Sequence, residues 1–408
     1  MAINNSKQKL GGNFSKLWVA NTISTVGDGA LLAAGPLLVA SQTQSPVLVA
    51  GAVVVQQLPW LLFTLISGVY VDRLNQQKLL IAANVFRAAA IGLVTVAISA
   101  HFINVPIIYA ALFMLGVGNT FADNSAVTFL TKLVPKHLLT KANARLQAVH
   151  TLGRQLAGPP FGAYLFVVAP AAPFGFDAIT FVVAALLIGW INVGPSDTKK
   201  PTSTNRSMSK EIREGFSWLW NTPLLRTVAV SSGMINLASM ASMASFVLFA
   251  EQQLKLNSIE YGVLLSIAAI GGIVGTFVLR PLQHILSDPS LLRASLLTEA
   301  LIFLAFAFTH SKWLAGALIF LLWFESAIWS TIATSLRQRE APAHLLGRVN
   351  SVFNLFRMGG LSIGALVGGL IAQAFGIGAP FLLSGIALLV LSIIMWRHFR
   401  IRSESGHL

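Results

Sequence analysis

The chain has 408 residues, of which 55% are hydrophobic and only 10% are charged. Soluble domains carry about 25% charged residues, so this composition excludes a protein whose whole surface faces water. The formal net charge of +14 would suit a nucleic-acid partner, but the basic residues lie mainly in short polar segments between long apolar blocks, so we expect no nucleic acid. The absence of cysteine excludes disulfides and thiolate metal sites.

Long apolar blocks follow one another along the whole chain. A helix needs roughly 20 apolar residues to cross a bilayer, whereas the strands of a membrane barrel need only about ten residues that alternate in polarity. These blocks are continuous and long, so we predict an all-α membrane protein with twelve transmembrane helices. The blocks cover roughly residues 15–41, 46–71, 79–101, 105–131, 143–168, 173–193, 224–250, 259–282, 291–309, 313–336, 348–374 and 378–397.

One long polar stretch divides the blocks into two sets of six. We predict an N-terminal six-helix bundle over residues 1–193, a cytoplasmic linker over 194–222 and a C-terminal six-helix bundle over 223–408. The two halves are also alike, because residues recur at an offset of 207 positions. Such a repeat predicts two pseudo-symmetric bundles of the same orientation. The recurring pairs include Pro135 with Pro342, Asn143 with Asn350, Gly153 with Gly360, and Gly162 with Gly369.

The lysines and arginines gather in alternate loops. With the N-terminus placed inside, most of the 28 basic residues fall in inner tails and loops, and the outer loops hold only Lys255 and Lys312. Basic loops stay in the cytoplasm, so we predict a multi-pass protein of a bacterial-type inner membrane with both termini cytoplasmic. We expect a monomer in the lipid bilayer that uses no metal or cofactor.

Between the second and third blocks the chain reads Gly68-Val-Tyr-Val-Asp72-Arg73-Leu-Asn-Gln-Gln-Lys78. This segment resembles the Gly-x-x-x-Asp-Arg-x-x-x-x-Lys/Arg signature of the major facilitator superfamily, and residues 275–280 resemble a degenerate second copy. The resemblance implies a transporter fold and a conformational gate, in which Asp72 approaches the start of the eleventh helix. The predicted gate residues are Gly68, Asp72, Arg73, Lys78, Arg87, Asp123, Arg145 and Arg348.

A finer resemblance, to the branch of drug, macrolide and enterobactin exporters, covers mainly the first half. It rests on Gly27-Asp28, on residues 119–124 and 133–145, and on Asp177-Ala178 with Phe181. We interpret Asp177 itself as structural, near the outer end of its helix.

The fifth block carries Gly153, Gly158, Pro159, Pro160 and Gly162. This run is similar to the antiporter signature of drug:proton exchangers, although the second proline and the following Ala163 depart from it. Small residues also let helices approach closely, and proline bends a helix. The motif therefore indicates either export by exchange or a plain packing seam with a kink.

Charges inside a membrane span are costly and mark functional candidates. Asp28 lies near the middle of the first predicted helix, and we take it first for proton coupling or for pairing with a cationic substrate. The alternative is a fixed ion pair within the first bundle.

Four further residues lie within the spans. Glu325, flanked by aromatic residues, suits a pocket for a bulky substrate or a buried structural position, and Glu299 is the weaker acid candidate. Arg154 and Arg357 would compensate the acids or meet an anionic substrate. His150 is a candidate for titration near neutral pH, or for a hydrogen-bonded structural role.

The sequence therefore favours a secondary exporter of lipophilic drugs, macrolide-like compounds or siderophores, driven by a proton gradient. An uptake permease for a small metabolite is the second transporter hypothesis. A membrane sensor or membrane enzyme is the different class. We expect no enzyme, because the chain has no HExxH, GxSxG or phosphate-loop motif.

Overall fold

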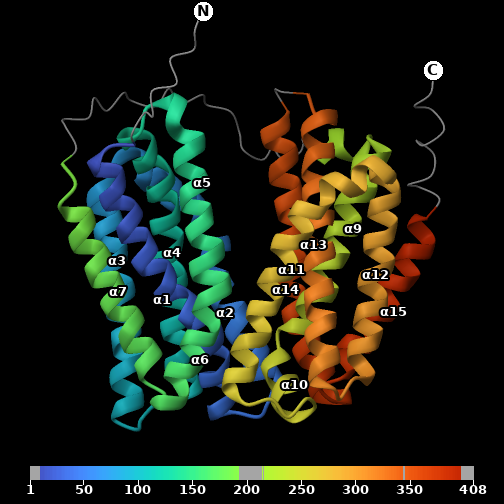
Figure 1. Ribbon diagram of the computed structural model, residues 1–408, viewed down its shortest axis with the longest axis horizontal. Coiled ribbons are helices and arrows are strands. Elements are labelled where there is room, and N and C mark those ends of the chain that lie inside the picture. Colours follow the sequence, from blue (N-terminus) through green and yellow to red (C-terminus); the bar gives the residue numbers. More distant parts are fainter. Residues whose placement is uncertain (1–9, 193–213, 215, 343–344, 397–408) are drawn as a thin grey trace, which may run out of the picture. The chain divides into compact units, whose positions relative to one another are not determined.

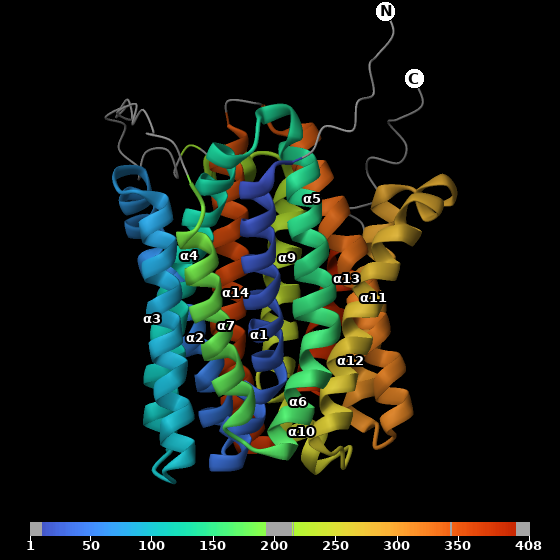
Figure 2. The same ribbon diagram turned by 60° about the vertical axis from the view of Figure 1, so that its left-hand side comes forward.

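A computed structural model describes residues 10–192, 214, 216–342 and 345–396. The described residues form helices, turns and short connections and contain no strand, which confirms the all-α membrane fold. The predicted linker over 194–222 lies largely outside the described residues. The chain divides into two compact units, and within each unit the helices run side by side (Figures 1 and 2).

Unit 1 contains residues up to Leu38 and from Val55 to the end of the first half. Its α3 packs between α4 and α7, around a core that includes Phe14, Leu80 and Phe129. The helices of the first half are α1 (Gly12–Gln42), α2 (Pro46–Arg73), α3 (Gln76–Ser99), α4 (Val105–Leu133), the 3-10 turn η1 (Lys136–Leu138), α5 (Leu139–Val149), the π-helix η2 (His150–Ala157), α6 (Gly158–Val168) and α7 (Ala172–Gly189).

Unit 2 contains the second half together with residues 39–54, which form the turn between α1 and α2. In this unit α9 packs on α14, α11 on α13, and α12 on α15. Its helices are α9 (Pro223–Met243), α10 (Phe246–Gln252), α11 (Ser258–Ile285), α12 (Asp288–Phe308), α13 (Lys312–Glu340), α14 (Leu346–Phe375) and α15 (Ala379–Met395).

The turn between α1 and α2 is held in unit 2 by side-chain contacts. The Ser45 hydroxyl donates to Oε1 of Gln373 at 2.9 Å, and Nε2 of Gln252 donates to Oε1 of Gln44 at 2.6 Å. Ala50 packs in a small apolar cluster with Ala244 and with Ala365 of α14. The chain therefore passes from one unit to the other within α1 and α2, while the predicted bundle boundaries stay a prediction.

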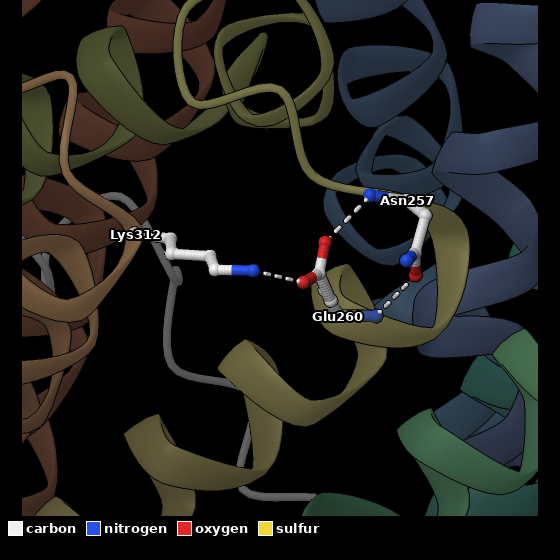
Figure 3. Close-up of polar contacts among 3 residues, drawn as sticks. All are labelled: Asn257, Glu260 and Lys312. Carbon is white, nitrogen blue, oxygen red and sulfur yellow. Dashed lines mark hydrogen bonds and ion pairs between the residues drawn. The ribbon is translucent and has the colours of Figure 1, made fainter.

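Asparagine side chains set the starts of several helices. Asn75 Oδ1 accepts the backbone N–H of Gln77 at 3.0 Å at the start of α3. At the start of α11, Asn257 and Glu260 exchange side-chain and backbone hydrogen bonds, and Lys312 Nζ lies 2.6 Å from Oε1 of Glu260 (Figure 3). These caps satisfy the N–H groups that a first helical turn leaves without partners.

Among the described residues, ten helices are long and apolar enough to cross a membrane. The last helix, α15, is apolar but has 17 residues, and the fifth predicted span is divided among α5, η2 and α6. The protein is thus a multi-pass helical membrane protein, and the count of twelve stays a prediction.

Candidate functional site

Asp28 lies in α1 between two glycines, and both glycines are points of close approach to other helices. A Cβ on Gly27 would collide with the carboxylate of Asp177 on α7. A Cβ on Gly29 would lie 2.8 Å from both Cα and the carbonyl oxygen of Arg154 on η2. The sequence Gly-Asp-Gly therefore brings the half-buried Asp28 between α7 and η2. Asp28 itself has no hydrogen bond or ion pair among the described residues.

The η2 segment replaces α-helical with π-helical bonding over His150–Ala157. The Gly158 N–H donates to the Gly153 carbonyl, five residues back, and the next two residues are prolines without an N–H. Short π-helical segments within α-helices are uncommon and occur frequently at functional sites. This one carries three of the predicted site residues, His150, Gly153 and Arg154.

Arg154 and His150 face each other one turn apart on η2. Nη1 of Arg154 lies 3.4 Å from Nε2 of His150. A guanidinium only donates, so we assign the acceptor role to Nε2 and the proton of a neutral ring to Nδ1. Nδ1 is buried and has no hydrogen-bond partner among the described residues. The ring therefore contacts the guanidinium of Arg154 and leaves one polar atom of its own unsatisfied.

Arg87 on α3 is the second cation of this region, and it is 7% exposed. Its Nη1 donates to Oδ1 of Asn119 at 3.0 Å, and its Nη2 donates to Oδ1 of Asn84 at 2.6 Å. Its guanidinium carbon lies 4.2 Å from the centre of the Phe181 ring. These contacts stabilise the charge without a directly bonded carboxylate.

Two more carboxyl groups complete what we call the Asp28 cluster, which consists of Asp28, Arg87, Asp123, His150, Arg154 and Asp177. Asp177 is fully buried, its Oδ1 accepts the Thr180 hydroxyl at 3.2 Å, and its Oδ2 has no partner among the described residues. Asp123 and Asp177 both lie within electrostatic range of Asp28 and of the two arginines. His150 lies within range of Asp28 and Arg154.

The charges of the Asp28 cluster do not balance. Among its described members, three carboxyl groups face two guanidinium groups while His150 is neutral. One negative charge therefore has no countercharge within the cluster, in which Asp177 is buried, Asp28 half-buried and Asp123 exposed. The described residues hold no group of three side chains gathered for a metal ion.

The antiporter-like motif forms a packing seam against α1. A Cβ on Gly158 would lie 2.5 Å from Cα of Gly29, and a Cβ on Gly162 would collide with the backbone of Ala30. Pro159 begins α6 directly after the π-helix. The motif thus brings the backbone of η2 and α6 against Asp28, and whether it also indicates exchange stays a prediction.

The candidates of the second half lie in unit 2. Glu325 on α13 is 4% exposed, and its Oε1 has no partner among the described residues. Arg357 on α14 is exposed. One turn before it, the ring of Phe353 carries the guanidinium of Arg337 at 4.4 Å. No acidic residue in the described part of the chain forms an ion pair with Arg357.

Several predicted gate residues lie at helix ends. Arg73 ends α2 and Lys78 lies in the first turn of α3, both exposed, and Arg145 is exposed on α5. Arg348, near the start of α14, pairs with Glu214 at 2.6 Å. The side chains of Gly68 and Asp72 lie outside the described residues, so the predicted approach of Asp72 to Arg348 stays a prediction. Arg87 and Asp123 belong to the Asp28 cluster.

Sequence reasoning gave little weight to two acidic residues that the structure buries. Asp177 was interpreted as structural, and its place beside Gly27 depends on the packing of α7 against α1. Glu299 was the weaker acid candidate, yet it is 2% exposed and bonded to Ser239 of α9. In both cases the only signal in the sequence was a carboxylate within an apolar block.

The chain is similar to known proteins along most of its length. Residues 10–406 match the family described as transmembrane secretion effector. The chain is 24% identical to the multidrug efflux pump Tap of Mycolicibacterium fortuitum, over 90% of this chain and 91% of Tap. It is 23% identical to macrolide efflux protein A of Streptococcus pyogenes, over 93% of this chain and 94% of that protein. It is 26% identical to the enterobactin exporter EntS of Shigella boydii, over 95% of this chain and 93% of EntS.

A solved structure supports the same fold. A bacterial homologue of the iron transporter ferroportin superposes with a TM-score of 0.76 at 18% identity, covering 96% of this chain and 100% of that one. The predicted resemblance to the drug, macrolide and enterobactin exporters is thereby confirmed. The chain belongs to the transmembrane secretion effector family of major facilitator transporters.

Proposed function

We propose that this transporter is a proton-coupled exporter of lipophilic or amphipathic compounds, with Asp28 as the group that exchanges the proton. Drugs, macrolide-like compounds and siderophores are the proposed substrates, and the names of the three efflux relatives support this range. We further propose that it acts as a monomer in the inner membrane with both termini in the cytoplasm, without a resident cofactor.

The observation that carries proton coupling is the charge imbalance of the Asp28 cluster. Asp177 is fully buried, whereas Asp123 on α4 is exposed and stays solvated. Asp28 is half-buried, has no bonded partner among the described residues and lies against the backbone of Arg154 through Gly29. It is therefore the carboxyl group of the cluster best placed to lose and regain a proton.

Proton binding would change the forces between helices. A charged Asp28 attracts Arg154 and Arg87 and repels the other two aspartates. A neutral Asp28 removes both effects and leaves the arginines to Asp123 and Asp177. Because Gly27 and Gly29 allow α1 to contact α7 and η2 closely, this change acts directly on the packing of α1. Outward movement of substrate against inward movement of protons would follow from alternating access of this kind.

The test uses everted membrane vesicles that contain the protein. We expect accumulation of a labelled macrolide or lipophilic cation when the vesicles are energised, and its loss on addition of an uncoupler. Asp28→Asn keeps the size of the side chain and cannot exchange a proton, so we expect it to abolish uncoupler-sensitive accumulation while binding of the substrate remains measurable.

The matched control is Asp288→Asn, at the start of α12, whose carboxylate lies 3.4 Å from Arg339 at the surface. This variant should accumulate substrate like the wild type. Full proton-driven accumulation by Asp28→Asn would rule out Asp28 as the coupling group. Accumulation in right-side-out vesicles, but not in everted ones, would instead favour the permease hypothesis.

A further inference from the structure

Unit 2 buries two glutamates on neighbouring helices. Glu299 on α12 is 2% exposed and Glu325 on α13 is 4% exposed, and the two helices pack against each other. The charge of Glu299 is the one that acts on Glu325. We call these residues the Glu299–Glu325 pair. Neither residue has an ion-pair partner among the described residues.

The two carboxyl groups differ in their hydrogen bonds. Oε1 of Glu299 accepts the Ser239 hydroxyl at 2.6 Å, a length typical of an O–H donor on a charged oxygen. Oε1 of Glu325 is buried without any partner, although Glu325 lies only one turn from Trp329, whose indole N–H donates to Ser232 at 3.1 Å. A charge on Glu299 is thus stabilised, whereas no hydrogen bond from the described part of the chain stabilises a charge on Oε1 of Glu325.

The cations of the surrounding helices are engaged elsewhere. On α11 and α13, Lys312 pairs with Glu260, and on α12 and α13, Arg339 pairs with Asp288. On α14, Arg348 pairs with Glu214, and α15 carries no charged residue. Arg226, Arg293 and Arg337 lie over the rings of Trp220, Trp396 and Phe353. The remaining charged or titratable groups of these helices, which do not act on Glu325, are Glu251, Tyr261, Arg280, His284, Glu340 and Arg357.

The Glu299–Glu325 pair has no acidic counterpart at the corresponding positions of the first half. The offset of 207 residues places Glu325 opposite Gly118 and Glu299 opposite Gly92. In unit 1, Gly118 leaves room for the side chain of Arg87, because a Cβ there would lie 2.5 Å from Cγ of Arg87. Corresponding helices therefore bury an arginine in one half and two acids in the other.

Two carboxylates buried together without a cation cannot both remain charged, because desolvation and mutual repulsion act in the same direction. We propose that the Glu299–Glu325 pair is a second proton-binding site of this transporter, with the bound proton on Glu325 and the negative charge on Glu299. The proton comes from water and returns to it, and no other bond changes. The existence of the site is independent of the proposed function, and only its use in transport rests on it.

Infrared spectroscopy of the purified protein in lipid nanodiscs tests the site directly. A protonated carboxyl group gives a C=O stretch distinct from that of a carboxylate, and the band shifts in deuterated water. Protonated carboxyl groups of the Asp28 cluster absorb in the same region, so the band of the pair is the part that the wild type shows and Glu325→Gln lacks in a difference spectrum. We expect that part to be present at neutral pH. Glu299→Gln should retain it, because Glu325 then still carries its proton.

Controls make each result decisive. Glu260→Gln, whose acid is ionised in its pair with Lys312, should leave the band unchanged. Ser239→Ala keeps both acids and should shift the band without removing it, which gives a second measurement if a glutamine variant does not fold. Equal carboxyl absorption in the wild type and in the double variant Glu299→Gln with Glu325→Gln would overturn the site. A band that disappears with Glu299→Gln alone would overturn the assignment to Glu325.

Transport assays then separate the two proposals. If the vesicles show no proton-driven export while Glu325→Gln removes the band, the proposed function fails and the proton site stands. If export is proton-driven and the band is absent from the wild type, the site fails and the function stands. If the proton site and proton-driven export are both observed, we expect Glu325→Gln to lower the number of protons moved per substrate molecule.

Discussion

Arg87 illustrates how a single residue can keep its charge inside a membrane bundle. Two asparagines accept its Nη hydrogens, and the face of Phe181 covers its guanidinium. Its Nε remains without a partner among the described residues, and its charge acts on Asp123 and Asp177. Arginine suits this place because its planar group both stacks and donates in several directions, which lysine cannot do.

Replacing Arg87 with methionine should therefore destabilise unit 1 strongly. Removing one partner from a buried charge network leaves the other charges uncompensated, which costs about 3–5 kcal/mol. Arg87→Lys should lose less, because the charge remains. Thermal unfolding in detergent checks this order, with Arg73→Gln at the exposed end of α2 as the control. An Arg87→Met variant as stable as the wild type would show that the cluster does not depend on this cation.

Single residues also show how far the sequence could lead. Asp28, Glu325, Arg154 and His150 were found because a polar side chain in an apolar block is visible without a structure. The proximity of Asp177 to Asp28 and of Glu299 to Glu325 was not visible, because the two members of each pair come from different helices. Full burial, which distinguishes Glu325 from Asp28, is a property of packing rather than of sequence.

At the scale of the helix, the least predictable element was η2. The Gly-Pro-Pro run predicted a bend, and the absence of two N–H groups explains why the α-helical pattern fails there. The change to π-helical bonding over His150–Ala157 could not be read from the sequence, because it depends on how α6 seats against α1. The close approach of Gly158 and Gly162 to α1 determines how α6 packs on α1.

Gly162→Ala tests the packing of α6 on α1. The new methyl group would meet the backbone of Ala30, so α6 must move away from α1, and we expect a loss of about 1–3 kcal/mol together with reduced export. Gly92→Ala on α3 is the matched control, since a Cβ there meets nothing within 4 Å. That variant should be neutral, or more stable by about 0.5–1 kcal/mol. Equal unfolding midpoints for the two variants would contradict a seam at Gly162.

At the scale of the whole chain, the internal repeat accounts for the packing pattern of both units. In unit 1 the glycines of α6 approach α1, and in unit 2 Gly360 and Gly364 of α14 approach α9. The first helix of each half thus packs on the fifth through small residues, although Gly369, the repeat partner of Gly162, lies against Val47 and Ala50 instead. The repeat does not extend to the charges, since unit 1 gathers aspartates with arginines and unit 2 buries glutamates alone.

The orientation of the chain in the membrane is predicted from charge alone, and the lack of native cysteine makes it simple to test. The connection between α3 and α4 has no lysine or arginine, whereas the region around η1 carries Lys132, Lys136 and Lys141. Basic loops remain on the cytoplasmic side. Phe102→Cys, in the first connection, should therefore react with a membrane-impermeant maleimide in intact cells. Lys136→Cys should react only after the cells are permeabilised. Labelling in the reverse order would invert the proposed topology, and with it the direction of transport that the proton gradient can drive.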